Sequence, residues 1–390
     1  MITNCCQHTV YPNFNQNHIL LLDLYDKHFF FGKLWNKSKK MCNLYLFWVL
    51  LFQFCVISAT NTTIKCTTDN FRYGQWIDGS NNCGLLDQYR PVPMRGQQRV
   101  YSYSDPEGKI LPPFKWSQYC WKPLKCNAIP FDGDKFCSNM KGKRIMFVGD
   151  SLLYEMYTAL YYQTLSDKNN VDTVVAQWDL NHVNAKQLRW TICNGTVGSI
   201  FIRNDHISVD DEDLEIRVTP RNTKIMWRHL IPSHDVIVLD KGHHVVKKEV
   251  ANEDIFQQAS IQTVEYLKKN AKGKTIVFVT TSPGHPHCSK NSTAITTPLT
   301  TEPEYIKKEL LPEYARNYGW ENYHKHDLFL INLFEKINAI IVDIAPMSYL
   351  RPDGHAFHDI DGPTNDCLHY RLPATPDSWL YVMYNLLFNK

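Results

Sequence analysis

The chain has 390 residues, a length that can bury one sizeable hydrophobic core with an elaboration around it. Its formal net charge of +3 and its isoelectric point near 8.1 are too mild to indicate a nucleic-acid-binding protein. The sequence contains no internal repeat and no long low-complexity tract.

The first predicted element is an uncharged apolar segment at residues 41–59. The basic cluster Lys37-Ser-Lys-Lys40 precedes it, and the segment is about long enough to cross a bilayer at about 1.5 Å per residue. Positive charge before it and polar sequence after it predict that the rest of the chain is lumenal. A buried core helix is the less favoured alternative.

Two interpretations of this segment stay open. In the first interpretation the segment is a signal anchor, residues 1–40 are a cytosolic or unstructured extension, and the chain is a type II membrane protein of the Golgi. Alternatively, translation starts at Met41 and the segment is a signal peptide cleaved near Ile57-Ser-Ala59, which gives a secreted protein. Both interpretations place the remainder in the secretory pathway.

The cysteines fit an oxidising lumen. Eight of them follow the apolar segment, and an even number in that compartment predicts disulfide bonds. Zinc ligation is disfavoured because the cysteines lack close C-x-x-C pairs, so no metal site is expected. Three tripeptides are N-glycosylation acceptors of the same compartment, and their asparagines are Asn61, Asn194 and Asn291.

Two regions follow the apolar segment. Residues 60–140 are rich in Cys, Pro and aromatic residues with little periodicity, which predicts a loop-rich subdomain tied by disulfides. Residues 141–390 alternate apolar strand runs with helical patterns. The predicted strands are Arg144–Val148, Val171–Ala176, Asp235–Leu239, Thr275–Val279 and Ala339–Ile344. The predicted helices are Leu152–Thr164, Asn252–Lys269, Pro303–Asn317, Asp327–Ile337 and Ser378–Phe388. Such alternation predicts an α/β fold with a parallel sheet covered by helices on both faces.

The most informative segment is Arg144-Ile-Met-Phe-Val-Gly-Asp-Ser151. The apolar run predicts a buried strand, and Gly149 permits a tight turn that leaves Ser151 at the carboxyl end of that strand. Open α/β sheets bind their ligands at this end. Taken alone, the tripeptide Gly-Asp-Ser is more typical of an ordinary strand-to-helix turn capped by Asp150 or Ser151.

A possible general base lies in Asp366-Cys-Leu-His369. A serine hydroxyl becomes a good nucleophile when a histidine takes its proton, and that histidine needs a carboxylate that fixes its tautomer. We therefore predict Ser151, Asp366 and His369 as a catalytic triad. The rival pair is Asp353 and His355, whose Asp lies two residues from the His rather than three.

A strand-end serine combined with a late Asp-x-x-His resembles the SGNH (GDSL-type) hydrolases, and within them the PC-esterase group that includes plant trichome-birefringence-like proteins. The likeness runs from about Cys66 to Trp379. It is carried by seven motifs in the family's order: Cys66 with Phe71-Arg-Tyr-Gly-Gln-Trp76, Trp121-Lys-Pro-Leu-Lys-Cys126, Lys141–Leu152, Lys241-Gly-His243, Thr281-Ser-Pro-Gly-His285, Arg351-Pro-Asp-Gly-His355 and Asp366-Cys-Leu-His369.

The resemblance implies an SGNH-like fold and several roles. It implies the disulfides Cys66–Cys126 and Cys288–Cys367. It also implies oxyanion or substrate positions, with the backbone N–H of Gly242 as an oxyanion donor. The other substrate-facing positions expected are His244, His285, Asp353 and His355. The chain departs from the family at Leu152–Met156 after the serine and at Tyr370-Arg371 after His369, the expected catalytic histidine. It also has Asp240-Lys-Gly-His-His244 in place of the family's Asn-Thr-Gly-His-Trp.

The resemblance also implies the activity. We expect a serine-dependent O-acetyltransferase that moves an acyl group from an acyl donor to a glycan hydroxyl through an acyl-enzyme. Two alternatives remain, a carbohydrate acylesterase and a non-catalytic extracellular glycan-binding domain of the same fold. The triad chemistry requires no metal or organic cofactor. The expected partners are the glycan acceptor, the acyl donor and, unless residues 41–59 are cleaved, the membrane.

Overall fold

The computed structural model describes residues 65–79, 118–164, 187–209, 226–244, 253–286, 288, 292–298, 307–355, 366–372 and 374–389. The chain divides into two units, Met1–Thr62 and Thr63–Lys390, and every described residue belongs to the second unit. The apolar segment 41–59, the strand predicted at Val171–Ala176, Asn61 and Asn291 lie outside the described residues. Within the described ranges, no helix is both long enough and apolar enough to cross a membrane.

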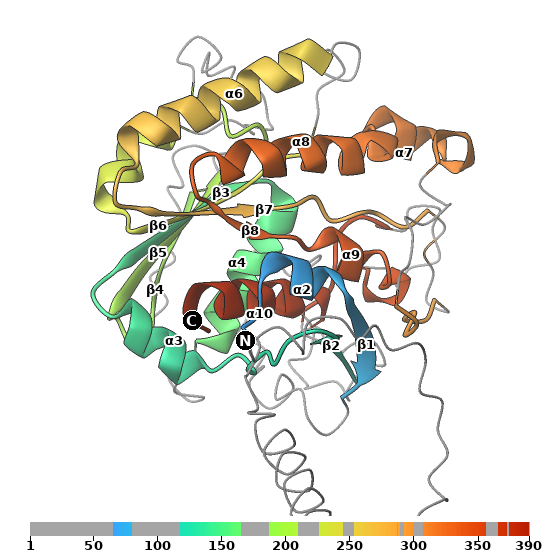
Figure 1. Cartoon of the computed structure of the whole chain (residues 1–390), viewed down its shortest axis with the longest axis horizontal. Helices are drawn as coiled ribbons and strands as arrows, with labels where there is room; N and C mark the ends of the chain where they lie inside the picture. Colours follow the sequence, from blue (N-terminus) through green and yellow to red (C-terminus); the bar gives the residue numbers. More distant parts are fainter. Residues whose placement is uncertain are drawn as a thin grey trace, which may run out of the picture. The chain divides into compact units, whose positions relative to one another are not determined.

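A sheet of six described strands forms the centre of the second unit (Figure 1). Its strands are β3 (Arg144–Gly149), β4 (Gln187–Ile192), β5 (Val197–Arg203), β6 (Val236–Asp240), β7 (Thr275–Val279) and β8 (Ile340–Val342). They lie side by side in the order β4-β5-β3-β6-β7-β8, and all neighbours pair in parallel except β4 with β5. The expected parallel sheet is present, with one antiparallel strand added at its edge.

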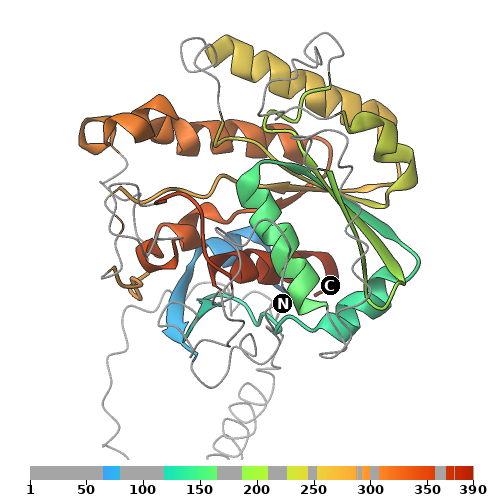
Figure 2. The ribbon, with the colours of Figure 1, turned by 180° about the vertical axis from the view of Figure 1, so that it is seen from behind.

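Helices cover both faces of this sheet, as the alternation of elements predicts. Helices α4 (Ser151–Gln163) and α10 (Thr375–Phe388) lie on one face, and α6 (Glu253–Asn270) and α8 (Tyr323–Glu335) lie on the other (Figures 1 and 2). Successive side chains of a strand point to opposite faces. In β3, Ile145 and Phe147 accordingly pack in the cluster with α4 and α10, while Met146 and Val148 pack in the cluster with α6 and α8.

Shorter elements complete the described chain. The α-helices among them are α2 (Thr68–Arg72), α3 (Gly133–Met140), α7 (Glu313–Asn317) and α9 (Ala345–Ser348). The 3₁₀ turns are η4 (Arg228–Ser233), η6 (Lys308–Leu310), η7 (Trp320–Asn322) and η8 (Pro352–Gly354). Strands β1 (Gly74–Asp78) and β2 (Tyr119–Pro123) form a separate two-stranded antiparallel sheet.

The described part of residues 60–140 shares the core of the main sheet. Phe71 and Trp76 are buried in the same hydrophobic cluster as α4 and α10, and the Trp76 indole N–H donates to the carbonyl of Met347 at 2.9 Å. Disulfides Cys66–Cys126 and Cys137–Cys193 close separations of 60 and 56 residues. In the chain-entropy model each closure of that size stabilises the fold by about 4 kcal/mol.

Two predicted elements differ from the structure. The helix predicted at Pro303–Asn317 is replaced, where described, by η6 and α7, because Pro312 cannot continue a helix and instead becomes the N-cap of α7. The hairpin of β4 and β5 was not predicted. Its turn places Cys193, Asn194 and Gly195 at φ of 57°, 52° and 85°. Asn and Gly adopt this left-handed conformation readily, whereas Cys193 adopts it while joined to Cys137 by a disulfide.

The join between β3 and α4 leaves no room for a side chain at Gly149. A Cβ there would lie 1.6 Å from Asp240 Oδ1, whereas a Cβ at Gly198 of β5 would meet only the flexible side chain of Arg144, at 3.4 Å. We expect Gly149→Ala to destabilise the protein by about 3 kcal/mol through overpacking and Gly198→Ala to change stability by less than about 0.5 kcal/mol. Equal shifts of the thermal midpoint in the two variants would contradict this account.

Candidate active site

Ser151 is the first residue of α4, at the carboxyl end of β3. Asp150 caps this helix, because its side chain accepts the backbone N–H of Leu152 at 2.8 Å. Ser151 keeps 8% of its surface exposed, whereas the residues around it on the strand and helix are almost fully buried. The turn therefore presents one hydroxyl at the edge of the sheet where ligands bind in α/β proteins.

The structure brings Ser151, Asp366 and His369 together. The Nε2 atom of His369 lies 2.7 Å from the Ser151 hydroxyl oxygen, and its Nδ1 atom lies 2.7 Å from Asp366 Oδ2. The other oxygen of Asp366 accepts the backbone N–H of His369 at 3.0 Å. Burial opposes ionisation of Asp366, but the hydrogen bond and charge of His369 outweigh it and lower the pKa of this carboxyl to about 2.

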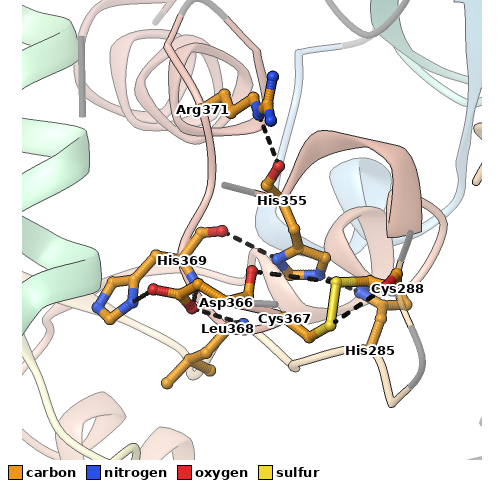
Figure 3. The surroundings of a disulfide bond; sticks show 8 residues. All are labelled: His285, Cys288, His355, Asp366, Cys367, Leu368, His369 and Arg371. Atoms are coloured by element: carbon orange, nitrogen blue, oxygen red, sulfur yellow. Dashed lines mark hydrogen bonds and ion pairs between the residues drawn. A yellow bond between two sulfur atoms is a disulfide. The ribbon is translucent and has the colours of Figure 1, made fainter. Parts of the chain in front are cut away.

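The loop that carries His369 is held by groups on both of its sides (Figure 3). A disulfide joins Cys367, which lies between Asp366 and His369, to Cys288. The ring of His355 contacts the carbonyl oxygen of His369 at 3.0 Å, and the backbone N–H of Tyr370 donates to Glu155 Oε2 at 3.0 Å. The position of the His369 ring is thus fixed through its main chain as well as through Asp366.

His285, Asp353 and His355, which were expected at substrate-facing positions, are buried side chains. His355 is fully buried, and His285 and Asp353 are 4% and 6% exposed. Asp353 forms a two-point ion pair with the buried guanidinium of Arg351. The Ser151 hydroxyl pairs with His369 instead, so the rival pair Asp353 and His355 is not assembled with the serine.

The two histidines form a buried pair. His285 Nδ1 lies 2.6 Å from His355 Nε2, the other nitrogen of His285 faces the carbonyl of Tyr349 at 2.9 Å, and that of His355 faces the carbonyl of His369. Three hydrogen bonds here need three ring protons, whereas two neutral imidazoles carry two. Burial lowers the pKa of His285 to about 4 and holds that of His355 well below its usual value. Near pH 7 one of the contacts therefore lacks its proton.

A second polar network joins the ends of β3 and β6. Asp150 Oδ2 contacts His243 Nδ1 at 2.6 Å, and the backbone N–H of Asp150 donates to Asp240 Oδ1 at 3.0 Å. His243 Nε2 lies 2.8 Å from the carbonyl of Ser282. Both ring nitrogens of His243 thus face oxygen atoms of other segments. The loop after β6, which includes Gly242, is thereby held against the turn that carries Ser151.

The pKa values of the two carboxyls of this network shift in opposite directions. Burial disfavours charge on both, but the charge and hydrogen bond of His243 hold the pKa of Asp150 well below its usual range. Burial and the neighbouring charge of Asp150 raise the pKa of Asp240 well above 3.8. Asp240 therefore keeps its proton to a higher pH than an ordinary aspartate does. It stands where the family motif has an asparagine, and a protonated carboxyl has nearly the shape of that amide.

Asp150, Asp240 and His243 are also the one set among the described residues whose spacing could hold a metal ion, with donor atoms within 4.8 Å of one another. Their donor atoms already make the hydrogen bonds described above, so an ion would bind only by displacing them. This set therefore acts as a hydrogen-bonding network that shapes the turn.

His244 lies at the half-open edge of the site, with 28% of its side chain exposed. Arg203 Nη2 lies 3.2 Å from His244 Nε2 and 3.0 Å from Asp205 Oδ2. A guanidinium only donates, so Nε2 of His244 accepts and the proton of the neutral ring sits on Nδ1. Burial lowers the pKa of His244 to about 4, so the ring is neutral at pH 7. Burial raises the pKa of Asp205 to about 7 despite the charge of Arg203.

Gly242 lies where a close approach requires glycine. A Cβ there would come within 2.0 Å of Thr281 Oγ1, a side chain held by Asp327.

Of the predicted glycosylation sites, Asn194 is described, and it is exposed on the turn between β4 and β5. Both disulfides that the resemblance implied, Cys66–Cys126 and Cys288–Cys367, are present.

Comparison with known proteins gives one family. The model of the PC-Esterase family, described as a GDSL/SGNH-like acyl-esterase family found in Pmr5 and Cas1p, matches residues 129–268 and 246–386. The two matches together span most of the chain. The chain belongs to this family. As a member of it, the protein is an SGNH-type acyltransferase or esterase.

Similar proteins come from plants. Protein trichome birefringence-like 14 of Arabidopsis thaliana is 24% identical over 82% of this chain and 87% of its own. Xyloglucan O-acetyltransferase 1 of Arabidopsis thaliana is 24% identical over 82% of this chain and 80% of its own. Xylan O-acetyltransferase 3 of Oryza sativa subsp. japonica is 26% identical over 70% of this chain and 67% of its own.

Two solved structures are also similar. A GDSL-like lipase from Parabacteroides merdae aligns with a TM-score of 0.34 at 14% identity, over 63% of this chain and 96% of its own. The periplasmic domain of a lipopolysaccharide acetyltransferase from Salmonella ser. Paratyphi A aligns with a TM-score of 0.31 at 12% identity, over 67% of this chain and 89% of its own.

Sequence reasoning missed three groups of the site. Glu155 lies one helical turn after Ser151 and is fully buried; burial raises its pKa well above 4.5, and its Oε2 accepts the Tyr370 N–H. The spacing of four residues from Ser151 was the available signal. The roles of His243 and Arg203 had no local signal, because each depends on a contact with a distant strand.

The raised pKa of Asp240 is testable. Because its folded-state pKa is raised above 3.8, the wild type loses stability as the pH rises from 3.8 through the folded-state pKa, whereas an amide does not titrate. We expect Asp240→Asn to match the wild type near pH 4 and to exceed its thermal midpoint by about 3 °C or more at pH 7.

The control is Asp240→Ala, which removes the acceptor of the Asp150 N–H. This variant should be less stable than the wild type at both pH values. If Asp240→Asn instead loses stability relative to the wild type as the pH rises, Asp240 is ionised in the folded protein and the assignment is wrong.

Proposed function

We propose that the protein transfers an acetyl group from an ester donor to a hydroxyl of a glycan through Ser151, His369 and Asp366. The observation that supports this most directly is the Ser151–His369–Asp366 chain of hydrogen bonds, with both contacts at 2.7 Å. Relatives that cover most of the chain are named xylan and xyloglucan O-acetyltransferases, which supports a glycan acceptor.

The proposed reaction has two halves. Ser151 Oγ attacks the acyl carbon of the donor while His369 Nε2 takes the serine proton, and Asp366 stabilises the resulting imidazolium. The negative oxygen of the tetrahedral intermediate is met by the backbone N–H groups of Ser151 and Gly242. Collapse of the intermediate expels the donor alcohol, which takes the proton from His369, and leaves an acetyl-serine.

The second half regenerates the enzyme. A sugar hydroxyl gives its proton to His369 Nε2 and attacks the acetyl carbon, and the new glycan ester leaves as Ser151 recovers the proton. Water in place of the sugar would make the protein an esterase. Incubation of the full chain with acetylated donors and an oligosaccharide panel distinguishes the two, because transfer adds about 42 mass units to an acceptor, one acetyl replacing one hydrogen.

The compartment belongs to the same proposal. Disulfides Cys66–Cys126, Cys137–Cys193 and Cys288–Cys367 support an oxidising lumen, since such bonds rarely persist in the cytosol. We propose that the chain works in the secretory pathway, where glycan acceptors are present, either anchored by residues 41–59 or released after their cleavage.

The nucleophile and base should act as one unit. We expect Ser151→Ala and His369→Ala each to lower kcat by about 10⁴-fold, and the double variant to lose little more, because neither group works without the other. A serine-directed fluorophosphonate should label the wild type and neither variant. Multiplicative losses in the double variant would rule out this pair.

The two candidate carboxylates give different outcomes. Asp366→Asn should fold and yet lose about 10⁴-fold in kcat, because an amide N–H facing His369 Nδ1 favours the wrong tautomer. Asp353→Asn weakens the ion pair with buried Arg351, so it should lower the thermal midpoint rather than kcat. Loss of kcat in Asp353→Asn with normal kcat in Asp366→Asn would transfer the role to Asp353.

A further inference from the structure

Two exposed tyrosines lie beside the candidate triad. Tyr314 on α7 and Tyr318 at the C-cap of that helix are 46% and 42% exposed. The backbone N–H of Tyr318 donates to the carbonyl of Tyr314 at 3.2 Å, so the two residues are one helical turn apart and share a side of α7. Singly exposed aromatic residues need no explanation. A pair on one side of a helix next to a nucleophile is a different case.

The packing beneath these tyrosines is fixed. Trp320 is 4% exposed and meets the Tyr314 ring edge to face, with centroids 5.7 Å apart at 89°. Its indole lies against Gly284, where a Cβ would come within 2.0 Å of the ring. Trp320, Leu311, Ala315 and Tyr323 form a small hydrophobic cluster. Tyr314 therefore packs against a buried side chain, Trp320, that is itself held in a hydrophobic cluster.

The same cluster is attached to the loop of the triad. Leu368, between Asp366 and His369, packs against it, and the side chain of Leu368 extends from the loop away from His355 (Figure 3). Burial and the charge of Asp366 raise the pKa of Tyr314, as expected for a phenol close to that carboxylate. Tyr314 thus lies on the Asp366 side of the site.

Tyr318, the other exposed tyrosine, lies next to His244. Their ring centroids are 5.9 Å apart at 83°. His244 is close enough to feel the charges of Asp150 and His369. Within the described chain, Nδ1 of His244 has no hydrogen bond, since Asp205 Oδ2 lies 4.0 Å away. The fixed tautomer therefore offers one N–H donor beside the Tyr318 ring.

Beside Tyr318, Arg203 forms an ion pair with Asp205 and the His244 ring is neutral. The surface combines two tyrosine rings and their hydroxyls with the neutral N–H donor of His244. A pyranose has the matching chemistry, because one of its faces carries mainly C–H groups and its rim carries oxygen acceptors.

We propose that Tyr314, Tyr318 and His244 form the subsite for the accepting sugar, in which a neutral pyranose ring stacks on a tyrosine face and an oxygen of the sugar accepts the His244 Nδ1–H. This subsite rests on the proposed glycan acetyl transfer and names where its acceptor is held. It also assigns a use to the histidine that replaces the tryptophan of the family motif.

Binding is measured on the full chain with Ser151→Ala, which cannot turn over, by titration calorimetry with xylan- and xyloglucan-derived oligosaccharides. Tyr314→Ala and Tyr318→Ala should each raise the Kd by about 3- to 10-fold, the range expected for loss of one aromatic contact. Tyr314→Phe and Tyr318→Phe should bind within about 2-fold of the parent, because the ring face is kept. His244→Phe should weaken binding, whereas His244→Gln, which keeps an N–H donor, should restore part of it.

The matched control is Tyr73→Ala, an equally exposed tyrosine at the end of α2, which should leave the Kd unchanged. Thermal unfolding of each variant checks that the fold is kept, since exposed substitutions change stability little. An oligogalacturonide, which is a charged sugar chain, should bind more weakly than the neutral ones.

Four results would overturn the subsite: no neutral oligosaccharide binds the parent, the two alanine variants bind like the parent, the phenylalanine variants lose as much as the alanine variants, or the charged chain binds tighter. Failure of the proposed function appears separately, as a wild-type protein that a fluorophosphonate does not label and that transfers no acetyl group. Binding of sugar by an unlabelled protein would support the subsite and reject the enzyme.

Discussion

The candidate site depends on the contact between α4 and α10, two helices that are far apart in the sequence and packed together in the fold. Ser151 opens α4, and His369 precedes α10, with 218 residues between the serine and the histidine. The helices pack in one buried cluster, and Asp377 links them directly. Its carboxylate caps α10 through the Ala374 N–H at 2.8 Å and accepts the Gln163 amide at the end of α4 at 2.6 Å. Because both helices rest on the same face of the sheet, the position of one fixes the position of the other.

The pKa shift differs from one buried acid to the next in this region, and the differences have a common cause. Burial raises the pKa of every carboxyl, so the pKa falls only where a histidine partner offsets the burial. Asp150 has His243, and Asp366 has His369 and two backbone N–H groups. Asp240 and Glu155 each accept one backbone N–H, which does not offset burial, and their pKa values are raised.

The sequence predicts the main elements well because they follow local patterns. The strands at Arg144–Gly149 and Thr275–Val279 are apolar runs bounded by polar residues, and they appear within one residue of the predicted limits. The motif of Ser151 and that of Asp366 and His369 also predicted that these three side chains lie together, and the structure places them in hydrogen-bond contact. The burial and mutual contact of His285 and His355 were not predicted, because a motif does not say whether a side chain points to solvent or into the core. The edge hairpin of β4 and β5 was missed because its Asn-Gly turn was interpreted as a glycosylation site.

The disulfide that joins the Asp366–His369 loop to Cys288 has a consequence for when the candidate site is completed during synthesis. At translation rates of about 5–20 residues per second, His369 leaves the ribosome roughly 10–40 seconds after Ser151. During that interval the nascent chain carries a serine with no base. Closure of Cys288 with Cys367 then adds the last constraint on the loop. A chain that stalls before this point, or one kept under reducing conditions, lacks the staple, so reactivity towards esters should appear only with oxidative maturation of an almost finished polypeptide.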